Sequence, residues 1–366
     1  MAKTVLIAFL GNTKFDARSQ NMAQSLFKNG FNVILVDELD SKNGNLINEN
    51  LIQHHVDTKF NSGIKRYWNY HCRVQEMSKK YCPDIFIAGD LFSLAVCSKQ
   101  KEDCLKIFDS REIYSKLASL VKKPIKQFFW SIYEQYFYKN MDQIIVTAQI
   151  DKKFLISKYG EKKIDIIHNF PKIQENVNYI NIRNKYNIPK NSKIFIYQGA
   201  IQIGRGIEEM ISLLTIFKNC VGLIVGDGEY KPQIDHIVKN KKLENRVFFT
   251  GSVPYSELIS LTKQSNIGFS IIQPLSKSYE QALPNKIFEY GLAGIPSIGS
   301  DFPEMKKYLE KFNLGIAVNP QNKEEHTNAV TKLLEFDESE KLISTVKENL
   351  TWYSQEKNFL SLMEND

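Results

Sequence analysis

The sequence has few cysteines, few histidines and no long apolar run, and each shortage excludes a class of protein. Its five cysteines are an odd number without a Cys-x-x-Cys pair. They argue against a disulfide framework and a thiolate zinc site, and they fit a reducing compartment. Its six histidines show no spacing of metal ligands. No apolar run approaches the roughly 20 residues that span a bilayer, and the opening MAKTVLIAFLG resembles a core strand more than a secretion signal. We therefore expect a cytoplasmic protein without a metal site.

Acidic residues are scarce relative to basic ones in the first half of the chain. Residues 1–170 contain 25 Lys and Arg against 18 Asp and Glu, a difference of +7, whereas the remainder contains 23 of each. Such an excess attracts an anionic partner. Because neither a zinc knuckle nor an aromatic RNA-binding motif is present, we expect no nucleic acid and favour peripheral contact with an anionic membrane.

The chain also lacks repeats, low-complexity tracts and charged tails. What remains is the composition of a soluble globular protein, with 43% hydrophobic and 24% charged residues. At 366 residues it is too long for one compact core, so two domains are expected.

The first half begins with a strand-helix-strand pattern. Thr4–Leu10 is an apolar run typical of a strand buried on both faces of a parallel sheet, and Gly11-Asn12 ends it. Asp16 is placed to cap a helix that Asn29-Gly30 ends, and Phe31–Val36 is the next strand. Open α/β sheets bind ligands at the carboxyl ends of strands, so the loop at Gly11 is a candidate binding site.

Charged residues follow another expected strand of this sheet. Further strands are expected at Pro83–Ala88, Lys106–Asp109, Ile144–Thr147 and Ile164–Ile167. Asp109, Arg111 and Glu112 then lie at a carboxyl end, where a binding cleft is expected. A helix cap with surface charges is the alternative interpretation.

Residues 122–139 combine four lysines with seven aromatic residues. The spacing predicts one helical face with Phe129, Trp130, Tyr133, Tyr136 and Phe137. A buried amphipathic helix is favoured over a helix that lies in a membrane interface, although both produce this pattern.

The second half repeats the α/β alternation after a polar linker at 172–192. Lys193–Gln198 is expected to be a strand, followed by a glycine-punctuated loop from Gly199 to Gly206 and a helix at Ile207–Lys218. Glycines let backbone amides approach a diphosphate, and Arg205 can grip it with a planar guanidinium. The later strands are expected at Leu223–Val225, Val247–Thr250, Ile267–Ile272, Ile295–Ile298 and Gly315–Val318.

The segment ALPNKIFEYGLAGIPSIGSD, residues 282–301, predicts a loop, a helix at Lys286–Leu292 and a strand. Gly294 tolerates a left-handed helix cap, and Pro296 cannot continue a helix. A lysine at a helix N-terminus favours an anion, and Glu289 can accept hydrogen bonds from sugar hydroxyls. Together they indicate a nucleotide-sugar, although an ordinary loop-helix-strand unit would show the same pattern.

Taken in order, these motifs resemble those of the family 4 glycosyltransferases. The resemblance rests on Asp16-Ala17-Arg18, Pro83-Asp84, Asp90-Leu91, Phe108–Glu112, Ile167–Pro171, Tyr197-Gln198-Gly199, Arg205-Gly206, Gly226-Asp227-Gly228, Gly251 and Pro284–Tyr290. It implies the GT-B fold, in which two Rossmann-like parallel-sheet domains face each other across a deep cleft. The acceptor domain would comprise residues 1–171 and the donor domain residues 172–349, with a C-terminal helix at about 350–366 packing back onto the first domain.

The resemblance also implies an activity. Members of the family transfer a sugar from a nucleotide-sugar, here a UDP- or GDP-sugar, to a hydroxyl with retention at the anomeric carbon. They use no metal or cofactor. The implied acceptor is a lipid-linked or oligosaccharide molecule in bacterial polysaccharide, lipopolysaccharide or capsule synthesis, at the inner face of the cytoplasmic membrane.

Residue roles are carried over by position. The catalytic residues implied are Arg205, Lys286, Asp109 and Arg111. The donor-binding residues implied are Gly11, Asn12, Gly199, Gly204, Gly226, Gly228, Val253, Gln281, Ala282, Leu283, Pro284, Asn285 and Glu289. The acceptor-binding residues implied are Asp16, Arg18 and Glu112.

Three positions depart from the family pattern. Gln281 replaces the first of two carboxylates, Ala200 replaces a basic residue, and Arg111 replaces a histidine found in many relatives. These departures leave two other functions open. One is a nucleotide-sugar epimerase with the same fold, and the other is a partner subunit that binds a nucleotide-sugar without turnover.

Overall fold

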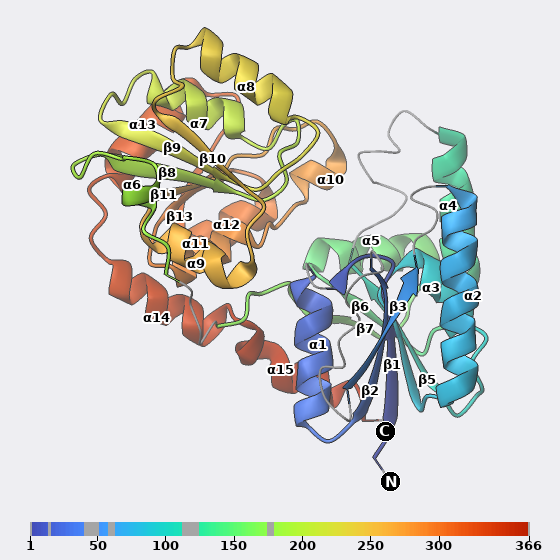
Figure 1. Cartoon of the computed structure of the whole chain (residues 1–366). Coiled ribbons are helices and arrows are strands. Elements are labelled where there is room, and N and C mark those ends of the chain that lie inside the picture. The colour runs from blue at the N-terminus through green and yellow to red at the C-terminus, as the bar shows by residue number, and fades with distance from the viewer. Residues whose placement is uncertain are drawn as a thin grey trace. The chain divides into compact units, whose positions relative to one another are not determined.

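The computed structural model describes residues 2–13, 16–39, 51–57, 63–111, 124–173 and 179–364. The chain divides into two compact units (Figure 1). Unit 1 comprises Met1–Lys172 and Gln355–Asp366, and unit 2 comprises Ile173–Ser354. Among the described residues, no helix is both long and apolar enough to span a bilayer.

Unit 1 contains a seven-stranded parallel sheet with the order β3-β2-β1-β4-β5-β6-β7. The strands are β1 (Thr4–Ala8), β2 (Asn32–Leu39), β3 (Leu51–Asp57), β4 (Ile85–Ala88), β5 (Leu105–Ser110), β6 (Gln143–Val146) and β7 (Ile164–Ile166). The central strands are buried on both faces because helices cover both sides of the sheet (Figure 1).

The helices of unit 1 connect these strands. They are α1 (Ala17–Lys28), α2 (Ile64–Tyr81), α3 (Leu91–Cys97), α4 (Pro124–Tyr138) and α5 (Gln149–Tyr159). The expected cap of α1 is confirmed, because the Asp16 side chain accepts a hydrogen bond from Ser19 N at 3.0 Å. The last helix, α15 (Trp352–Ser361), contributes its residues from Gln355 onward to this unit.

Four elements of unit 1 were not predicted from the sequence, namely β3, α2, α3 and α5, and the first two are instructive. β3 reads LIQHHVD, in which polar residues interrupt the apolar run expected of a buried strand. It pairs with β2 through seven residues, so pairing rather than hydrophobicity defines it. α2 is a basic helix whose buried residues Tyr70, Val74, Met77 and Ser78 have the i, i+4, i+7 and i+8 spacing of an amphipathic helix, so its signal was present in the sequence and was overlooked.

The face expected for residues 122–139 is also revised. Trp130, Tyr133 and Phe137 pack against the core of unit 1. Phe129 and Tyr136 instead point outward, at 59% and 67% exposure. The five aromatic side chains therefore divide between two sides of α4, because a helix with aromatic residues at nearly every spacing has no unique apolar face.

Unit 2 contains a six-stranded parallel sheet with the order β10-β9-β8-β11-β12-β13. The strands are β8 (Lys193–Gln198), β9 (Cys220–Val225), β10 (Val247–Gly251), β11 (Ile267–Ser270), β12 (Ser297–Ser300) and β13 (Gly315–Val318). The helices are α6 (Ile182–Lys185), α7 (Ile207–Leu214), α8 (Lys231–Asn240), α9 (Tyr255–Lys263), α10 (Lys277–Glu280), α11 (Lys286–Leu292), α12 (Pro303–Lys311), α13 (Lys323–Leu333) and α14 (Ser339–Asn349).

Several predictions for unit 2 are confirmed and others are revised, among them the helix expected at Ile207–Lys218, which ends at Leu214. β8, β13 and α11 have the expected bounds, and Gly294 has the expected positive φ of 80° after α11. The last strand of residues 282–301 begins two residues later than expected, at Ser297. The segment 172–192 is not only a linker, because Ile182 and Ile188 are buried in the core of unit 2.

The order of the strands identifies a switch point in unit 2. From β8 the chain builds the sheet outward through β9 and β10, and it then returns to β11 on the other side of β8. Loops that leave the carboxyl ends of β8 and β11 therefore diverge. In open α/β sheets such a divergence forms the crevice that binds ligands.

Candidate functional site

The loop after β8 is held by close backbone contacts. A Cβ atom at Gly226 would lie 2.0 Å from the carbonyl oxygen of Gly199, so only glycine lets the loops after β8 and β9 meet. At Gly206 the φ angle is +82° and a Cβ atom would lie 2.2 Å from the Ile271 carbonyl oxygen. The loop is therefore locked against the strands on either side of β8.

Arg205 extends from this loop over an aromatic ring. Its guanidinium carbon lies 4.5 Å from the centroid of the Tyr279 ring in α10. Within the described residues, no carboxylate forms a salt bridge with Arg205. An aromatic face orients a guanidinium but does not neutralise it, so the charge of Arg205 is available to an anion.

Lys286, the first residue of α11, lies beside the same loop. Its Nζ is 3.7 Å from the centroid of the Tyr197 ring and 3.8 Å from the position a Cβ atom would take at Gly199. Burial and the positive charge of Arg205 lower the pKa of Lys286 to about 7, although Glu289 acts in the opposite direction. The ligand-free site therefore disfavours the charged ammonium, and an anion bound there would restore it.

Glu289 lies one turn further along α11 and is held in place from β8. Gln198 donates a hydrogen bond from Nε2 to Glu289 Oε2, while its Oε1 accepts one from the Thr262 hydroxyl at 3.0 Å. Tyr290 donates to the Phe269 carbonyl at 3.1 Å, which ties α11 to β11. The carboxylate of Glu289 is thus oriented at the carboxyl end of β8, next to Lys286.

The start of α11 offers fewer free amides than its sequence suggests. Ile287 N donates to Pro284 O at 3.3 Å, and Phe288 N donates to Asn285 O at 3.0 Å. These bonds close a tight turn at the helix entrance. The positive potential of the site therefore comes mainly from Arg205, joined by Lys286 when its amine is protonated.

The remaining predicted donor-binding residues of unit 2 lie in loops or at loop edges. Gln281, Ala282, Leu283, Pro284 and Asn285 are all partly exposed in the turn between α10 and α11. Val253 follows β10 and packs, partly buried, against a core cluster.

Gly204 and Gly228 complete the close contacts of the loops. A Cβ atom at Gly204 would lie 2.5 Å from the Leu275 side chain, and one at Gly228 would lie 2.2 Å from the Ile201 carbonyl oxygen. Sequence reasoning missed Tyr197, Tyr279 and Gln198 as site residues, because aromatic and amide residues at strand and helix ends have no distinctive spacing.

A pocket of about 450 Å³ borders the Arg205 loop. Its lining includes Gly204, Arg205 and Tyr230. Gln273 donates from Nε2 to Glu209 at 2.5 Å on the same pocket wall, and burial raises the pKa of Glu209. The pocket therefore presents both a cation and a polar wall at the edge of the predicted donor site.

In unit 1, the carboxylate of Asp109 lies in a buried cluster of charged side chains. It is 0% exposed and contacts Arg18 Nη2 and Arg111 Nε at 2.7 Å each. Burial alone would raise the pKa of Asp109, but the two guanidiniums outweigh it and hold the pKa below the ordinary value. Asp109 is therefore an anion whose charge is already balanced by the protein.

The positions of Arg18 and Arg111 qualify their predicted roles. Arg18 is 1% exposed and also donates to the Ile167 carbonyl at 2.7 Å, so in this structure it supports Asp109 rather than facing an acceptor. Arg111 is 13% exposed and contacts Asp16 at 2.5 Å, and its guanidinium lies 4.5 Å from the centroid of the Phe9 ring. Glu112, the third residue predicted to bind the acceptor, lies outside the described residues.

Gly11 and Asn12 lie in the loop after β1, as expected. Sequence reasoning missed the cluster beside them, in which Asp37 accepts hydrogen bonds from the Thr13 hydroxyl at 2.5 Å and contacts His55 Nδ1 at 2.5 Å. His55 belongs to β3, and without that strand its proximity to Asp37 had no signal in the sequence.

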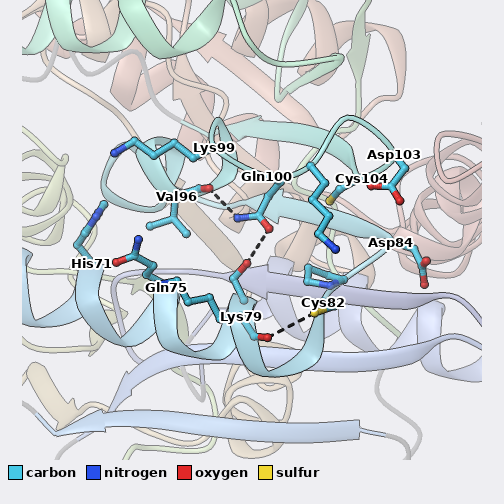
Figure 2. Close-up of a pocket in the computed structure, with 13 residues that line it drawn as sticks. His71, Gln75, Lys79, Cys82, Asp84, Val96, Lys99, Gln100, Asp103 and Cys104 are labelled. Atoms are coloured by element: carbon cyan, nitrogen blue, oxygen red, sulfur yellow. Dashed lines mark hydrogen bonds between the residues drawn. The ribbon is translucent and has the colours of Figure 1, made fainter.

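A second pocket, of about 330 Å³, lies at the opposite edge of the unit 1 sheet. Figure 2 shows it between the ends of α2 and α3, where Gln100 accepts a hydrogen bond from Ser78 at 2.7 Å and donates one to the Val96 carbonyl at 2.8 Å. Its wall includes Asp84, which precedes β4, so the pocket lies at the amino ends of the strands. Ligands of open α/β sheets bind at the other edge, and this pocket is not the candidate site.

No group of three or more histidine, cysteine, aspartate or glutamate side chains is placed to hold a metal ion in the described ranges. The charged groups that the structure brings together in unit 2 are Arg205, Lys286 and Glu289, all at the switch point of the sheet.

Comparison with known proteins shows that this chain is similar to a glycosyltransferase superfamily. Residues 178–349 match the model of the family "Glycosyl transferases group 1". An uncharacterized glycosyltransferase of Methanocaldococcus jannaschii is 21% identical over 266 residues, which are 69% of this chain and 65% of that protein. Alpha-D-kanosaminyltransferase of Streptomyces kanamyceticus is 27% identical over 161 residues, which are 43% of this chain and 40% of that protein. The chain thus spans less than two thirds of the length of these relatives.

Solved structures align with nearly the whole chain. Sucrose-phosphate synthase from Thermosynechococcus elongatus has a TM-score of 0.83 at 14% identity and covers 99% of this chain and 98% of its own. WaaG, a glycosyltransferase involved in lipopolysaccharide biosynthesis, has a TM-score of 0.74 at 14% identity, with 99% and 100% covered. HepE of Anabaena in complex with UDP-glucose has a TM-score of 0.77 at 13% identity, with 99% of both chains covered. These similarities establish the GT-B fold, with two Rossmann-like parallel-sheet domains.

Proposed function

With the glycosyltransferase group 1 superfamily as the premise, which the family match and the relatives support, we propose that this chain transfers a sugar from a nucleotide-sugar to a hydroxyl. The observation that carries the proposal is the pair Arg205 and Lys286. Both cations lie over aromatic rings beside one glycine-rich loop, and neither has a carboxylate within salt-bridge distance among the described residues.

A diphosphate is the anion that suits this pair. It carries negative charge on two adjacent groups, so one group can contact Arg205 and the other Lys286. Arginine offers a planar fork of donors to phosphate oxygens, while lysine acts as a point charge. Glu289, oriented by Gln198, is then placed to accept hydrogen bonds from ribose hydroxyls.

The proposed catalysis is electrostatic. As the glycosidic bond to the nucleotide breaks, negative charge grows on the leaving diphosphate, and Arg205 and Lys286 stabilise that charge more strongly than in the bound donor. We expect retention by front-face displacement, in which a donor phosphate oxygen takes the proton of the acceptor hydroxyl. In this scheme the two side-chain cations take the part that a divalent metal plays in other transferases, and no cofactor is used.

In unit 1, some residues of the ion cluster would face a ligand and others would support them. Asp16 and Arg111 are 19% and 13% exposed and are the members of the ion cluster that can reach a sugar or an acceptor. Asp109 and Arg18 are buried beneath them and hold the loop after β5 in place. Gly11 and Asn12 are proposed to meet the donor phosphates through the loop after β1.

The donor is proposed to be a UDP- or GDP-sugar, and the acceptor a lipid-linked or saccharide molecule of bacterial surface-glycan synthesis. HepE, which has the same fold, was crystallised with UDP-glucose, and WaaG takes part in lipopolysaccharide biosynthesis. The basic excess of residues 1–170 would favour an anionic membrane, at the inner face of which the protein would act peripherally.

Thermal unfolding with UDP, GDP and their sugars tests the donor. A true donor at about 100 times its Kd should stabilise the folded chain by about 2.7 kcal/mol through mass action. Transfer assays with the stabilising donor then test the reaction, with the anomeric configuration of the product read by NMR.

Other outcomes would assign another function. Epimerisation of a free nucleotide-sugar without an acceptor would indicate an epimerase. Tight nucleotide binding without transfer to any lipid-linked or oligosaccharide acceptor would indicate a binding subunit, as the glutamine at position 281 suggests.

A further inference from the structure

Exposed large apolar side chains of the described residues are concentrated on one surface of unit 1. Five of the thirteen lie on α4, and these are Ile125, Phe128, Phe129, Ile132 and Tyr136, between 51% and 84% exposed. Ile64 and Trp68, in the first two turns of α2, are 85% and 67% exposed. The other six are distributed singly over separate segments, where isolated apolar residues are normal.

The exposed residues of α4 form a continuous stripe. Relative to Ile125 they occupy positions 3, 4, 7 and 11, which is the spacing of a buried helix face. The opposite side of α4 already packs on the core through Trp130 and Phe137. α4 is therefore apolar on two sides, and the described residues of its own unit cover only one of them.

Aromatic contacts place the first turns of α2 beside α3 and the covered side of α4. The Tyr67 ring stacks on Phe92 at 4.2 Å and meets the Trp130 ring edge-on at 6.3 Å. Ile64 and Trp68 are within one turn of Tyr67, so they lie close to the N-terminal half of α4. We call the surface made by Ile64, Trp68 and the five exposed α4 residues the α2–α4 face.

The exposed charges that the described residues place around the α2–α4 face are basic. Lys65 and Lys126 are exposed within it, and Lys139 follows the end of α4. The acidic residue of α4, Glu134, is 0% exposed on the covered side, and burial raises its pKa. The acidic residue of α2, Glu76, forms a salt bridge with Arg73 at 2.7 Å.

We infer that the α2–α4 face docks on a bilayer that contains anionic lipids. Aromatic and aliphatic side chains on a helix with lysines can enter the boundary between headgroups and acyl chains, and the lysines then contact lipid phosphates. A second copy of the chain is a poorer occupant, because it would bring two sets of lysines together. The inference deepens the proposed function by identifying the membrane surface, and it rests on that function for its biological role.

Vesicle flotation with the full-length chain tests the inference. We expect about tenfold more binding to phosphatidylcholine vesicles containing phosphatidylglycerol than to phosphatidylcholine alone, and weaker binding at about 0.5 M salt. The double variant Phe128→Ser with Ile132→Ser should lose about 90% of the bound fraction. Ile216→Ser with Tyr353→Ser is the matched control, since it removes two exposed apolar residues elsewhere.

Three results would overturn the inference: equal binding to both vesicle types, unchanged binding of the α4 variant, or an equal loss in the control. Lipid-free self-association abolished by the α4 variant would also overturn it and assign the face to a second copy. The thermal shifts caused by UDP and by GDP are measured on the same samples. If neither nucleotide gives a shift while vesicle binding persists, the proposed donor is wrong and the membrane surface stands.

Discussion

Arg205 and Lys286 are oriented by the rings of Tyr279 and Tyr197, which hold the two side chains without a counter-charge. A carboxylate in place of the Tyr279 or Tyr197 ring would hold its cation equally well, but an incoming phosphate would then have to displace that carboxylate. A cation over a ring contributes about 0.5–2 kcal/mol and leaves the hydrogen-bond donors free. At the scale of residues, the arrangement supports the proposal that this site binds an anion, because no internal salt bridge of the described residues has to be broken first.

The first prediction concerns Arg205 and its ring. Arg205→Ala should reduce kcat by about 10²–10³-fold, as for the loss of one donor to the transition state. Tyr279→Leu should reduce kcat/KM by about 3–30-fold because it removes the cation–π contact, whereas Tyr279→Phe keeps the ring and should retain activity. Steady-state kinetics with the identified donor measure all three, and an unchanged rate in Arg205→Ala would remove Arg205 from the mechanism.

The second prediction concerns the proton of Lys286. Its pKa of about 7 leaves the amine mostly neutral at pH 8, and a bound diphosphate raises the pKa, so UDP binding at pH 8 should take up close to one proton. Calorimetry in buffers of different ionisation enthalpy measures this uptake. Lys286→Met should abolish it, and the exposed control Lys263→Met should not; uptake that persists in Lys286→Met contradicts the assignment.

The pH dependence of the stability of the ligand-free protein follows from the same pKa shift. The pKa of Lys286 is lowered relative to the unfolded chain, so the unfolded state binds more protons between pH 7 and the ordinary lysine value of 10.5. The free energy of unfolding should therefore rise with pH across that window, and this rise should be smaller in Lys286→Met.

At the scale of elements, the strand-to-helix loops of unit 2 depend on glycines that have no room for a side chain. The loops after β8, β9 and β11 contact one another through backbone atoms, which places Gly199 beside Lys286 and Arg205 beside α10. The geometry of the cations is therefore a property of three loops together rather than of any single motif.

The third prediction compares two glycines that have the same backbone conformation in different surroundings. Gly206 and Gly30 have φ angles of 82° and 84°, but a Cβ atom would lie 2.2 Å from the Ile271 carbonyl oxygen at Gly206 and would meet nothing within 4 Å at Gly30. Gly30→Ala should cost only the left-handed strain of about 1–2 kcal/mol. Gly206→Ala should cost more and weaken UDP binding, measured by urea unfolding and calorimetry; equal costs would contradict a crowded loop.

At the scale of the whole molecule, the chain passes from unit 1 to unit 2 and its last residues return to unit 1. Gln355 accepts a hydrogen bond from His168 N at 2.8 Å and donates one to His168 O at 2.5 Å. Ser25 in α1 donates to Glu356 at 2.5 Å, and Phe359 is fully buried. The C-terminal segment is therefore a structural part of the unit that begins the chain.

The fourth prediction follows from this return of the chain. Phe359→Ala should destabilise unit 1 by about 3–5 kcal/mol through the lost burial and the remaining cavity. Tyr353→Ala on the same helix changes a side chain that is 78% exposed and should cost less than about 0.5 kcal/mol. Hydrogen exchange should show lost protection in β1 and β2 but not in β8, and equal loss in both sheets would contradict the assignment.

Short-range patterns in the sequence were sufficient for much of the fold. Continuous apolar runs predicted β8 and β13, Asp16 predicted the cap of α1, and Gly294 with Pro296 predicted the end of α11, because each depends on neighbouring residues along the chain. The resemblance to the family 4 glycosyltransferases grouped Arg205, Lys286 and Glu289, which do lie near one another in unit 2, and their shared function stays a prediction.

Tertiary structure alone decided which polar groups are satisfied and which apolar groups remain uncovered. β3 forms because β2 offers a partner edge, and Asp37 meets His55 only through that pairing. Arg18 became a buried support for Asp109, and α4 buried one apolar side while exposing the other, although its sequence is apolar on both. Burial and long-range pairing depend on which segments pack together, and the local spacing of residues along the chain does not determine that packing.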